Sequence, residues 1–280
     1  MGIKLITFDL DGTLLDDQHK LHEKTIEAVE AIRKKGTKTL VATGRMYVSA
    51  KPHIDKLEMK DPVITYNGAL VMNPLEDKEL YHSPIPFPIA KKISKKVEKC
   101  NYYLQAFLDD TLYVAEKNDY TKKYEHIAGV VAQTVGSINE FMDKGPTKML
   151  IMEEDEDIQV DIRNFLLSNF ADDIEVSASY PSFIEITKKG ISKVEPLKRL
   201  AAEYNIKREE IMVFGDGLND LTMVEWAGVG IAMENAHPRL RESADDIAHN
   251  HGELGVARYL KKHFELDIDL SKLSKEIKQP

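Results

Sequence analysis

The stretch Ile3-Lys4-Leu5-Ile6-Thr7-Phe8-Asp9-Leu10-Asp11-Gly12-Thr13 decides the fold. Its first six residues are an apolar run that predicts a buried β-strand. Two carboxylates, Asp9 and Asp11, follow where that strand ends, and Gly12 permits a tight turn after them. Ligands bind at the carboxyl edge of open α/β sheets, so the stretch predicts a ligand site at the end of the first strand.

Alternating strands and helices occupy the first and last thirds of the chain. After the first strand, the first third predicts a helix over 22–35, a strand over 39–42, a helix over 46–57 and a strand over 62–66, followed by a hairpin over 69–82. The last third predicts helices over 193–204 and 219–226 and strands over 211–214, 229–232 and 246–248. Repeated strand–helix units imply a parallel sheet with right-handed crossovers. The predicted fold class is α/β, with a Rossmann-like, doubly wound parallel sheet as its core.

The middle of the chain has a different pattern. A proline-rich joint, Ser83-Pro84-Ile85-Pro86-Phe87-Pro88, precedes a predicted helix over 88–99. The remaining predicted elements are strands over 102–108, 111–115, 148–152, 174–179 and 183–187 and a helix over 158–170. This α+β pattern has antiparallel character, so we predict an inserted cap domain over residues 84–186. The catalytic core would then be discontinuous, with residues 1–83 and 187–280.

Composition limits the compartment and the partners. The 280 residues are 42% hydrophobic, which is enough for one large core or two smaller ones. A net charge of −9 disfavours a nucleic-acid backbone as partner, although local cations and a metal ion can still hold a small anion. The single cysteine excludes an internal disulfide and favours a reducing compartment, no apolar run is long enough to span a membrane, and we expect no signal peptide. We therefore expect a cytoplasmic protein that binds no membrane and no nucleic acid.

Three predicted strands end in polar loops that open on one edge of a parallel sheet. The first loop carries Asp9 and Asp11, and the loop Gly215–Asp220 carries Asp216. These three carboxylates are hard oxygen ligands of the kind that Mg²⁺ prefers. We therefore consider them candidate ligands of a magnesium ion.

Further polar residues near the same edge suit a phosphate group. Thr43 and Gly44 offer a hydroxyl and a backbone N–H at the start of a helix, where anions bind favourably. Lys193 is able to neutralise phosphate charge in a transition state, and Asn219 is able to donate to a phosphate oxygen. Taken singly, each feature has a structural alternative: an N-cap, a solvated lysine, a helix-capping loop, or an Arg45 paired with surface acids. Their joint occurrence at strand ends and helix starts favours a phosphate site.

With these residues the chain resembles the haloacid dehalogenase superfamily, and within it the Cof-type sugar-phosphate phosphatases with a large type-two cap. Asp9-Leu10-Asp11-Gly12-Thr13 is similar to motif one, and Thr43-Gly44-Arg45 is similar to the Cof-type form of motif two. Lys193 is similar to motif three, and Gly215–Asp220 to motif four. Asn67-Gly68-Ala69 and Ala232–Ala236 also resemble family segments, so the resemblance covers nearly the whole chain.

The resemblance implies a role for each of these residues. Asp9 would attack phosphorus, and Asp11 would protonate the leaving alcohol and then activate water, which requires a raised pKa for the Asp11 carboxyl. Phosphate binding would fall to the residues Leu10, Thr43, Gly44, Arg45, Lys193 and Asn219. The Mg²⁺ cofactor would be held by Asp9, Asp216, Asp220 and the backbone carbonyl of Asp11, with Asp220 alternatively supporting Lys193.

The expected function is a Mg²⁺-dependent phosphatase of a small phosphorylated metabolite, such as a sugar phosphate, that works through an aspartyl-phosphate. One alternative is a phosphomutase or phosphotransferase on the same scaffold, and another is a non-catalytic, metabolite-binding regulatory protein. Asp11 and Asp216 disfavour a halide-releasing dehalogenase, because they support phosphate and metal chemistry. The inserted domain would act as a lid, and we expect a monomer or a weak homodimer.

Overall fold

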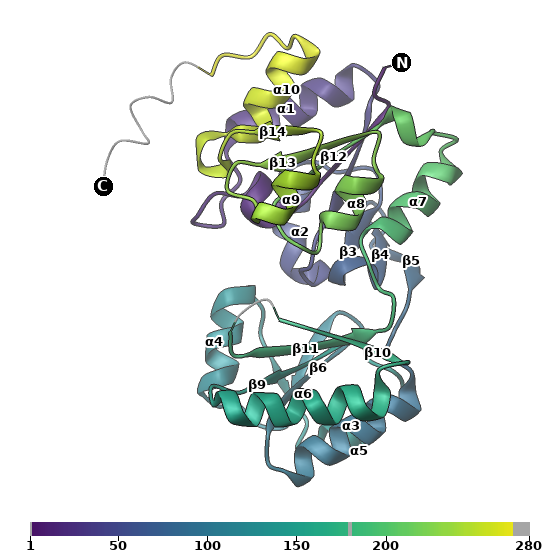
Figure 1. The fold of residues 1–280 in the computed structure, drawn as a ribbon, viewed down its shortest axis with the longest axis vertical. Helices are drawn as coiled ribbons and strands as arrows, with labels where there is room; N and C mark the ends of the chain where they lie inside the picture. The colour runs from purple at the N-terminus through teal and green to yellow at the C-terminus, as the bar shows by residue number, and fades with distance from the viewer. Residues whose placement is uncertain (1, 179–180, 271–280) are drawn as a thin grey trace.

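The computed structural model describes residues 2–178 and 181–270, and it contains two lobes stacked along the long axis (Figure 1). We call the part built on an eight-stranded sheet the larger lobe (residues 2–82 and 194–270) and the part built on a six-stranded sheet the smaller lobe (residues 87–178 and 181–188). The last residues of the predicted core segment, 271–280, lie outside the described residues. No helix in the described part of the chain combines the length and apolarity that a bilayer span requires.

The sheet of the larger lobe has the strand order β14-β13-β12-β1-β2-β3-β4-β5. All neighbours from β14 to β3 are parallel, and only the β3–β4 and β4–β5 pairs are antiparallel. The predicted α/β class with a doubly wound sheet is confirmed, and the predicted hairpin over 69–82 is formed by β4 and β5. The strands are β1 (Leu5–Phe8), β2 (Lys38–Ala42), β3 (Val63–Thr65), β4 (Leu70–Asn73), β5 (Lys78–His82), β12 (Ile211–Gly215), β13 (Val229–Met233) and β14 (Asp246–Ala248).

Helices cover both faces of this sheet. The chain moves outward from β1 in one direction and from β12 in the other, so right-handed crossovers place the two sets of helices on opposite faces. Helices α1 and α10 pack against each other, while α8 contacts both α7 and α9 (Figure 1). The helices are α1 (Glu23–Lys34), α2 (Tyr47–Lys56), α7 (Val194–Glu203), α8 (Leu221–Trp226), α9 (Pro238–Ser243) and α10 (Gly255–Phe264).

The sheet of the smaller lobe has the order β10-β11-β9-β6-β7-β8 and is antiparallel except for the β7–β8 pair. Its strands are β6 (Tyr103–Leu108), β7 (Thr111–Val114), β8 (Gln133–Thr134), β9 (Lys148–Met152), β10 (Ile174–Ser177) and β11 (Phe183–Lys188). Its helices are α3 (Phe87–Lys99), α4 (Asp119–Ala128), α5 (Ile138–Phe141) and α6 (Glu156–Phe170).

The two faces of the smaller sheet have different neighbours. One face packs Ala106, Met149 and Ile184 against the apolar stripes of α3 and α6, which forms a separate core. The alternate residues of the same strands, including Phe107 and Leu150, belong to the same apolar cluster as the core of the larger lobe. Successive side chains along a strand point to opposite faces of the sheet. One face of the smaller sheet therefore packs on the helices of its own lobe, and the other faces the larger lobe.

Four helices in the described residues were not predicted from the sequence: the short helices α5 and α9, and the longer helices α4 and α10. Helix α4 has Tyr120 and Tyr124 one turn apart, and Asn118 and Thr121 form a capping box at its start. Helix α10 buries Val256 and Leu260, also one turn apart. Both helices carry a periodic apolar signal, but many charged residues separate the apolar positions.

Asp110, in the tight turn between β6 and β7, connects the two lobes. Its Oδ1 accepts hydrogen bonds from the backbone N of Tyr47 and from the Tyr66 hydroxyl, both at 2.9 Å, and its Oδ2 accepts from the backbone N of Val48 at 2.5 Å. The carboxylate therefore lies at the N-terminus of α2, where negative charge is favourable. Since these donors all belong to the larger lobe, Asp110 holds the smaller lobe against it.

We predict that Asp110→Ala exposes the N-terminus of α2. Hydrogen bonds to a charged group contribute about 1.5–3 kcal/mol, so the Tyr47 and Val48 amides should exchange with solvent at least ~10-fold faster. Hydrogen-exchange mass spectrometry measures this change. The matched control is Asp109→Ala, since Asp109 is exposed and has a similar positive φ of 47° beside 55° for Asp110. Equal acceleration in both variants would show that turn strain, and not the carboxylate, protects these amides.

Candidate active site

The candidate site lies where three neighbouring strands of the larger sheet end. Strands β12, β1 and β2 are adjacent and parallel, so their carboxyl ends meet at one edge. Asp9 follows β1, Thr43 follows β2, and Asp216 follows β12. The backbone N of Asp9 donates to the carbonyl of Phe214 at 3.1 Å, which ties the first acidic loop to the end of β12.

Lys193 lies beneath this edge and is fully buried. Its Nζ donates to Asp9 Oδ1 at 2.6 Å and to Asp220 Oδ1 at 2.7 Å. The alternative of a solvated surface lysine is therefore wrong. The two carboxylates raise the pKa of the Lys193 ammonium against the effect of burial, which by itself would lower it.

Asp220 links this ion pair to the loop after β12. Its Oδ2 accepts hydrogen bonds from the backbone N atoms of Asp216 and Gly217, both at 3.0 Å, while its Oδ1 holds Lys193. Both oxygens of this buried side chain therefore already have donors. Asp220 fixes the shape of the Asp216 loop and the position of the lysine at the same time.

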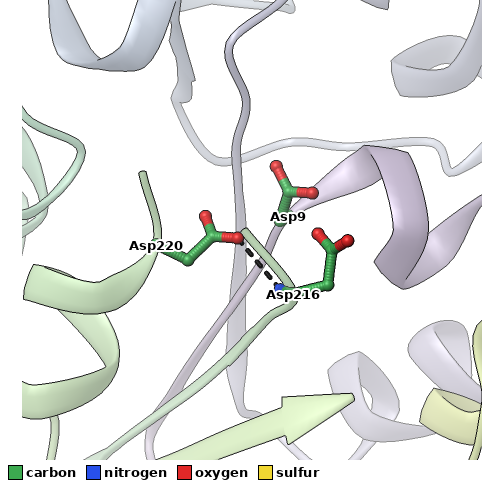
Figure 2. Close-up of side chains that lie close together, drawn as sticks. All are labelled: Asp9, Asp216 and Asp220. Carbon is green, nitrogen blue, oxygen red and sulfur yellow. Dashed lines mark hydrogen bonds between the residues drawn. The ribbon is translucent and has the colours of Figure 1, made fainter. Parts of the chain in front are cut away.

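The carboxylates of Asp9, Asp216 and Asp220 converge, as Figure 2 shows, and one oxygen from each lies within 4.8 Å of the others. Burial, and the charges of neighbouring carboxylates, raise the pKa of Asp9 well above its usual range, against the attraction of Lys193. Burial and Asp220 raise the pKa of Asp216 to about 7. Three carboxylates thus share one ammonium group, and a divalent cation with a preference for oxygen ligands fits this excess of negative charge.

Asp11 points away from this cluster and binds Arg45. The guanidinium donates from Nε to Asp11 Oδ2 at 2.7 Å and from Nη2 to Oδ1 at 2.6 Å, and His19 Nδ1 lies 3.1 Å from Oδ1. Burial acts to raise the pKa of the Asp11 carboxyl, but the hydrogen bonds and charges of Arg45 and His19 outweigh it, so the pKa is lowered. The raised pKa expected from the sequence is therefore wrong for this arrangement, because Arg45 stabilises the carboxylate.

The remaining predicted phosphate-binding residues surround the same edge. Thr43 is buried, and its hydroxyl accepts from the backbone N of Arg45 at 3.1 Å, while Gly44 is half-buried beside the Asn67 side chain. Leu10 directs its side chain into the apolar core, which leaves only its backbone for contact with a ligand. Asn219 is exposed, and its Nδ2 donates to Asn67 Oδ1 at 2.9 Å.

Asn67 and His19 also lie at the site, although they are not among the site residues predicted from the sequence. Asn67 follows the end of β3, so the rule that selected the polar residues after β1, β2 and β12 also applies to it. His19 comes from the loop after Asp11, and no sequence spacing indicates that this loop folds back. Gly12 shows why that loop is tight: its φ is +72°, and a Cβ there would lie 2.2 Å from Asp216 Oδ2.

A cavity of about 820 Å³ opens above these residues and is closed from the other side by the smaller lobe. The larger lobe lines it with residues that include Asp9, Asp11, Arg45, Asn67 and Asp216. The smaller lobe lines it with Tyr124, Ile127, Ala128, Lys148, Ser177, Ala178, Phe183 and Glu185. Its size is that of a typical small-molecule pocket, and the acidic cluster lies at its floor.

Comparison with known proteins agrees with this geometry. Residues 6–260 match the model of the haloacid dehalogenase-like hydrolases. A 5-amino-6-(5-phospho-D-ribitylamino)uracil phosphatase of Bacillus subtilis is 32% identical over 267 residues, which cover 94% of this chain and 98% of that protein.

Solved structures extend the likeness to the whole fold. A protein from Thermotoga maritima superposes with a TM-score of 0.87 at 33% identity, over 95% of this chain and 98% of that one. A sugar phosphatase of subclass IIB superposes with a TM-score of 0.78 at 28% identity, over 94% and 99% of the two chains. The predicted family and the predicted enzyme class, a phosphoric monoester hydrolase, are confirmed. The chain belongs to the haloacid dehalogenase-like hydrolase family.

Proposed function

We propose that this chain is a Mg²⁺-dependent phosphatase that hydrolyses the phosphomonoester of a small metabolite, such as a sugar phosphate, through an aspartyl-phosphate. The observation that carries the proposal is the buried Lys193, which bridges Asp9 and Asp220 beside Asp216 at the floor of a cavity between the two lobes. Phosphoryl transfer requires positioning and neutralisation of negative charge, and these groups supply both.

Asp9 is the proposed nucleophile. It lies at the cavity floor, and Lys193 holds its Oδ1, which fixes the carboxylate and leaves Oδ2 to attack phosphorus. The new bond joins Oδ2 to phosphorus while the bond from phosphorus to the leaving alcohol breaks. Thr43, Gly44, Asn219 and the backbone of Leu10 surround the position where the phosphoryl oxygens would lie.

Asp11 is the proposed general acid and base. Its carboxylate is held by Arg45, so it accepts a proton only when the guanidinium turns away. A substrate phosphate competes for that guanidinium because it carries more negative charge than one carboxylate. Substrate binding would thereby release Asp11 to protonate the leaving alcohol and afterwards to take a proton from the attacking water.

Asp9 and Asp216 are the proposed side-chain ligands of Mg²⁺, together with the backbone carbonyl of Asp11. Asp220 is better placed as a support, since both of its oxygens already accept hydrogen bonds. When bound, the ion offsets charge between the nucleophile and the phosphate.

The smaller lobe is the proposed cap, over residues 84–186, and the hinges are the Pro-rich joint 83–88 and the return 188–191. It lines the cavity above the acidic cluster, and its closure over a bound substrate would exclude bulk water. A phosphatase for 5-amino-6-(5-phospho-D-ribitylamino)uracil and a sugar phosphatase are among the similar proteins, so both kinds of phosphate belong among the candidate substrates. We further propose that the protein is cytoplasmic and is a monomer or weak homodimer.

We expect the protein to release phosphate from p-nitrophenyl phosphate only in the presence of Mg²⁺. EDTA should abolish the release and added Mg²⁺ should restore it. A panel of sugar phosphates, nucleotides and the phosphoribityl pyrimidine then identifies preferred leaving groups. Release without an acceptor sugar separates a phosphatase from a phosphomutase, and no release from any compound would contradict the proposed function.

Asp9→Asn should reduce turnover below detection, because the amide is a poor nucleophile. The steady-state rate of phosphate release measures the loss of turnover, and a thermal melt checks that the fold is retained. Asp119→Asn is the matched control, since its side chain is 96% exposed on α4. Turnover by Asp9→Asn comparable to the control would exclude Asp9 as the nucleophile.

Mg²⁺ should bind more tightly as the pH rises through about 7. Without metal the pKa of Asp216 is about 7, so below this pH a proton occupies the carboxyl that the ion needs. The proton on Asp216 should therefore lower the apparent affinity by up to ~10-fold per pH unit below 7, and the raised pKa of Asp9, the second proposed ligand, adds to this pH dependence. Calorimetric titrations in buffers of different ionisation enthalpy measure both the affinity and the released proton. An affinity independent of pH between 5.5 and 8 would contradict this linkage.

A further inference from the structure

The smaller lobe places a buried ion pair in the wall of the cavity. Lys148 begins β9 and Glu185 lies on β11, and the distance from Nζ to Oε1 is 3.1 Å. Their side chains are only 8% and 12% exposed. Both residues line the same cavity as Asp9 and Asp216, so they face the part of a bound phosphate ester that leaves.

The surroundings of this pair are mostly apolar and aromatic, and the Tyr124 side chain also makes a hydrogen bond with Lys148. Phe107 lies opposite Lys148 on the neighbouring strand, with its ring centre 4.7 Å from Nζ, and Leu150 lies opposite Glu185. The ring of Tyr124 on α4 is 5.9 Å from the same Nζ. Charged side chains in such a setting lose hydration. A protein in which two apolar side chains of similar volume replace a buried ion pair is often as stable as the original, or more stable. Stability of the sheet therefore does not account for the pair, whereas its place on the cavity wall does.

The charges of the pair determine which leaving group it accepts. Among the described residues that line the cavity from the smaller lobe, Lys148 and Glu185 are the charged ones, and their charges cancel. A second anion on the leaving group would meet an ammonium that Glu185 already neutralises. A hydroxyl group accepts a hydrogen bond from Lys148 and donates one to Glu185 at the same time.

We infer that Lys148 and Glu185 select the leaving group, and that they favour a neutral, hydroxyl-bearing one over one with a second phosphate or carboxylate. The inference rests on the proposed phosphatase function. A hexose and a ribityl chain both carry such hydroxyls, so either leaving group would present a neutral polyol to the pair. The substrate panel distinguishes hexose phosphates from ribityl phosphates. The aromatic rings of Tyr124 and Phe183 beside the pair, 6.0 Å apart, offer apolar faces to the carbon chain.

Fructose 6-phosphate and fructose 1,6-bisphosphate test the inference, as substrates or as competitive inhibitors of p-nitrophenyl phosphate hydrolysis. Whichever phosphate of the bisphosphate reacts, the leaving group carries the other. The wild-type protein should favour the monophosphate. Glu185→Gln leaves the Lys148 charge unbalanced and should shift the preference toward the bisphosphate at least ~10-fold, while Lys148→Met leaves Glu185 unbalanced and should shift it at least ~10-fold the other way.

The ratio of the two specificity constants is measured on one preparation, so it does not depend on the fraction of folded protein. In the double variant Lys148→Met/Glu185→Gln the two positions carry no charge. Its preference should return toward that of the wild-type protein, and it should bind both fructose phosphates more weakly. Lys123→Met and Glu154→Gln, from an exposed pair of the same lobe at 3.3 Å, are the controls and should leave the ratio unchanged.

Equal changes for both fructose phosphates in both variants would assign the pair a purely structural role and overturn the inference. A wild-type preference for the bisphosphate would overturn it as well. Absence of Mg²⁺-dependent p-nitrophenyl phosphate hydrolysis in the wild-type protein would instead contradict the proposed function, and the inference would fall with it.

Discussion

The buried ammonium of Lys193 is the constraint on which the site depends. A lysine with no exposed surface is tolerable only when anions replace its lost water, and here Asp9 and Asp220 do so at 2.6 and 2.7 Å. Asp9 and Lys193 are 184 positions apart in the chain. Removal of one partner from such a pair typically costs about 3–5 kcal/mol, so the first and last thirds of the chain must assemble around it. The same contact that joins the two segments also orients the carboxylate at the cavity floor.

The charges at this edge leave the site ready for a cation and an anion together. Lys193 alone does not balance Asp9, Asp216 and Asp220, which is why burial and mutual repulsion raise the pKa values of Asp9 and Asp216. Arg45 meanwhile is held by Asp11 on the other side of the opening. A metal ion would lower the first imbalance, and a phosphate would draw Arg45 from Asp11. The acidic cluster would thus be balanced by the cation, and Arg45 by the phosphate.

The positions of some of these side chains follow from the sequence, because a local rule applies to them. Asp9, Thr43 and Asp216 follow buried strands, and adjacent parallel strands must end at one edge, so their convergence follows from topology alone. Lys193 was harder to place, because its neighbours in the chain are charged and its burial depends on a contact with Asp9 far away in sequence. The Arg45–Asp11 pair was missed as a restraint for the same reason: the pKa of Asp11 depends on where a flexible side chain lies, which no spacing shows. Helix α4 was predictable in principle, because the capping box of Asn118 and Thr121 marks its start in the sequence.

In the proposed function, the larger lobe carries the reacting groups and the smaller lobe selects the leaving group. The groups proposed to act on phosphorus all come from the larger lobe, and those that would contact a leaving group come mainly from the inner face of the smaller sheet. Residues on that face alternate along each strand with residues that pack on α3 and α6. Lys148 and Glu185 therefore lie outside the separate core formed by residues such as Ala106 and Met149. Asp110 docks this face at the start of α2, directly after Arg45 and Met46. In the proposed function, a change of leaving group would then require substitutions on this sheet face and on α4, while the ion pairs beneath the phosphate stay as they are.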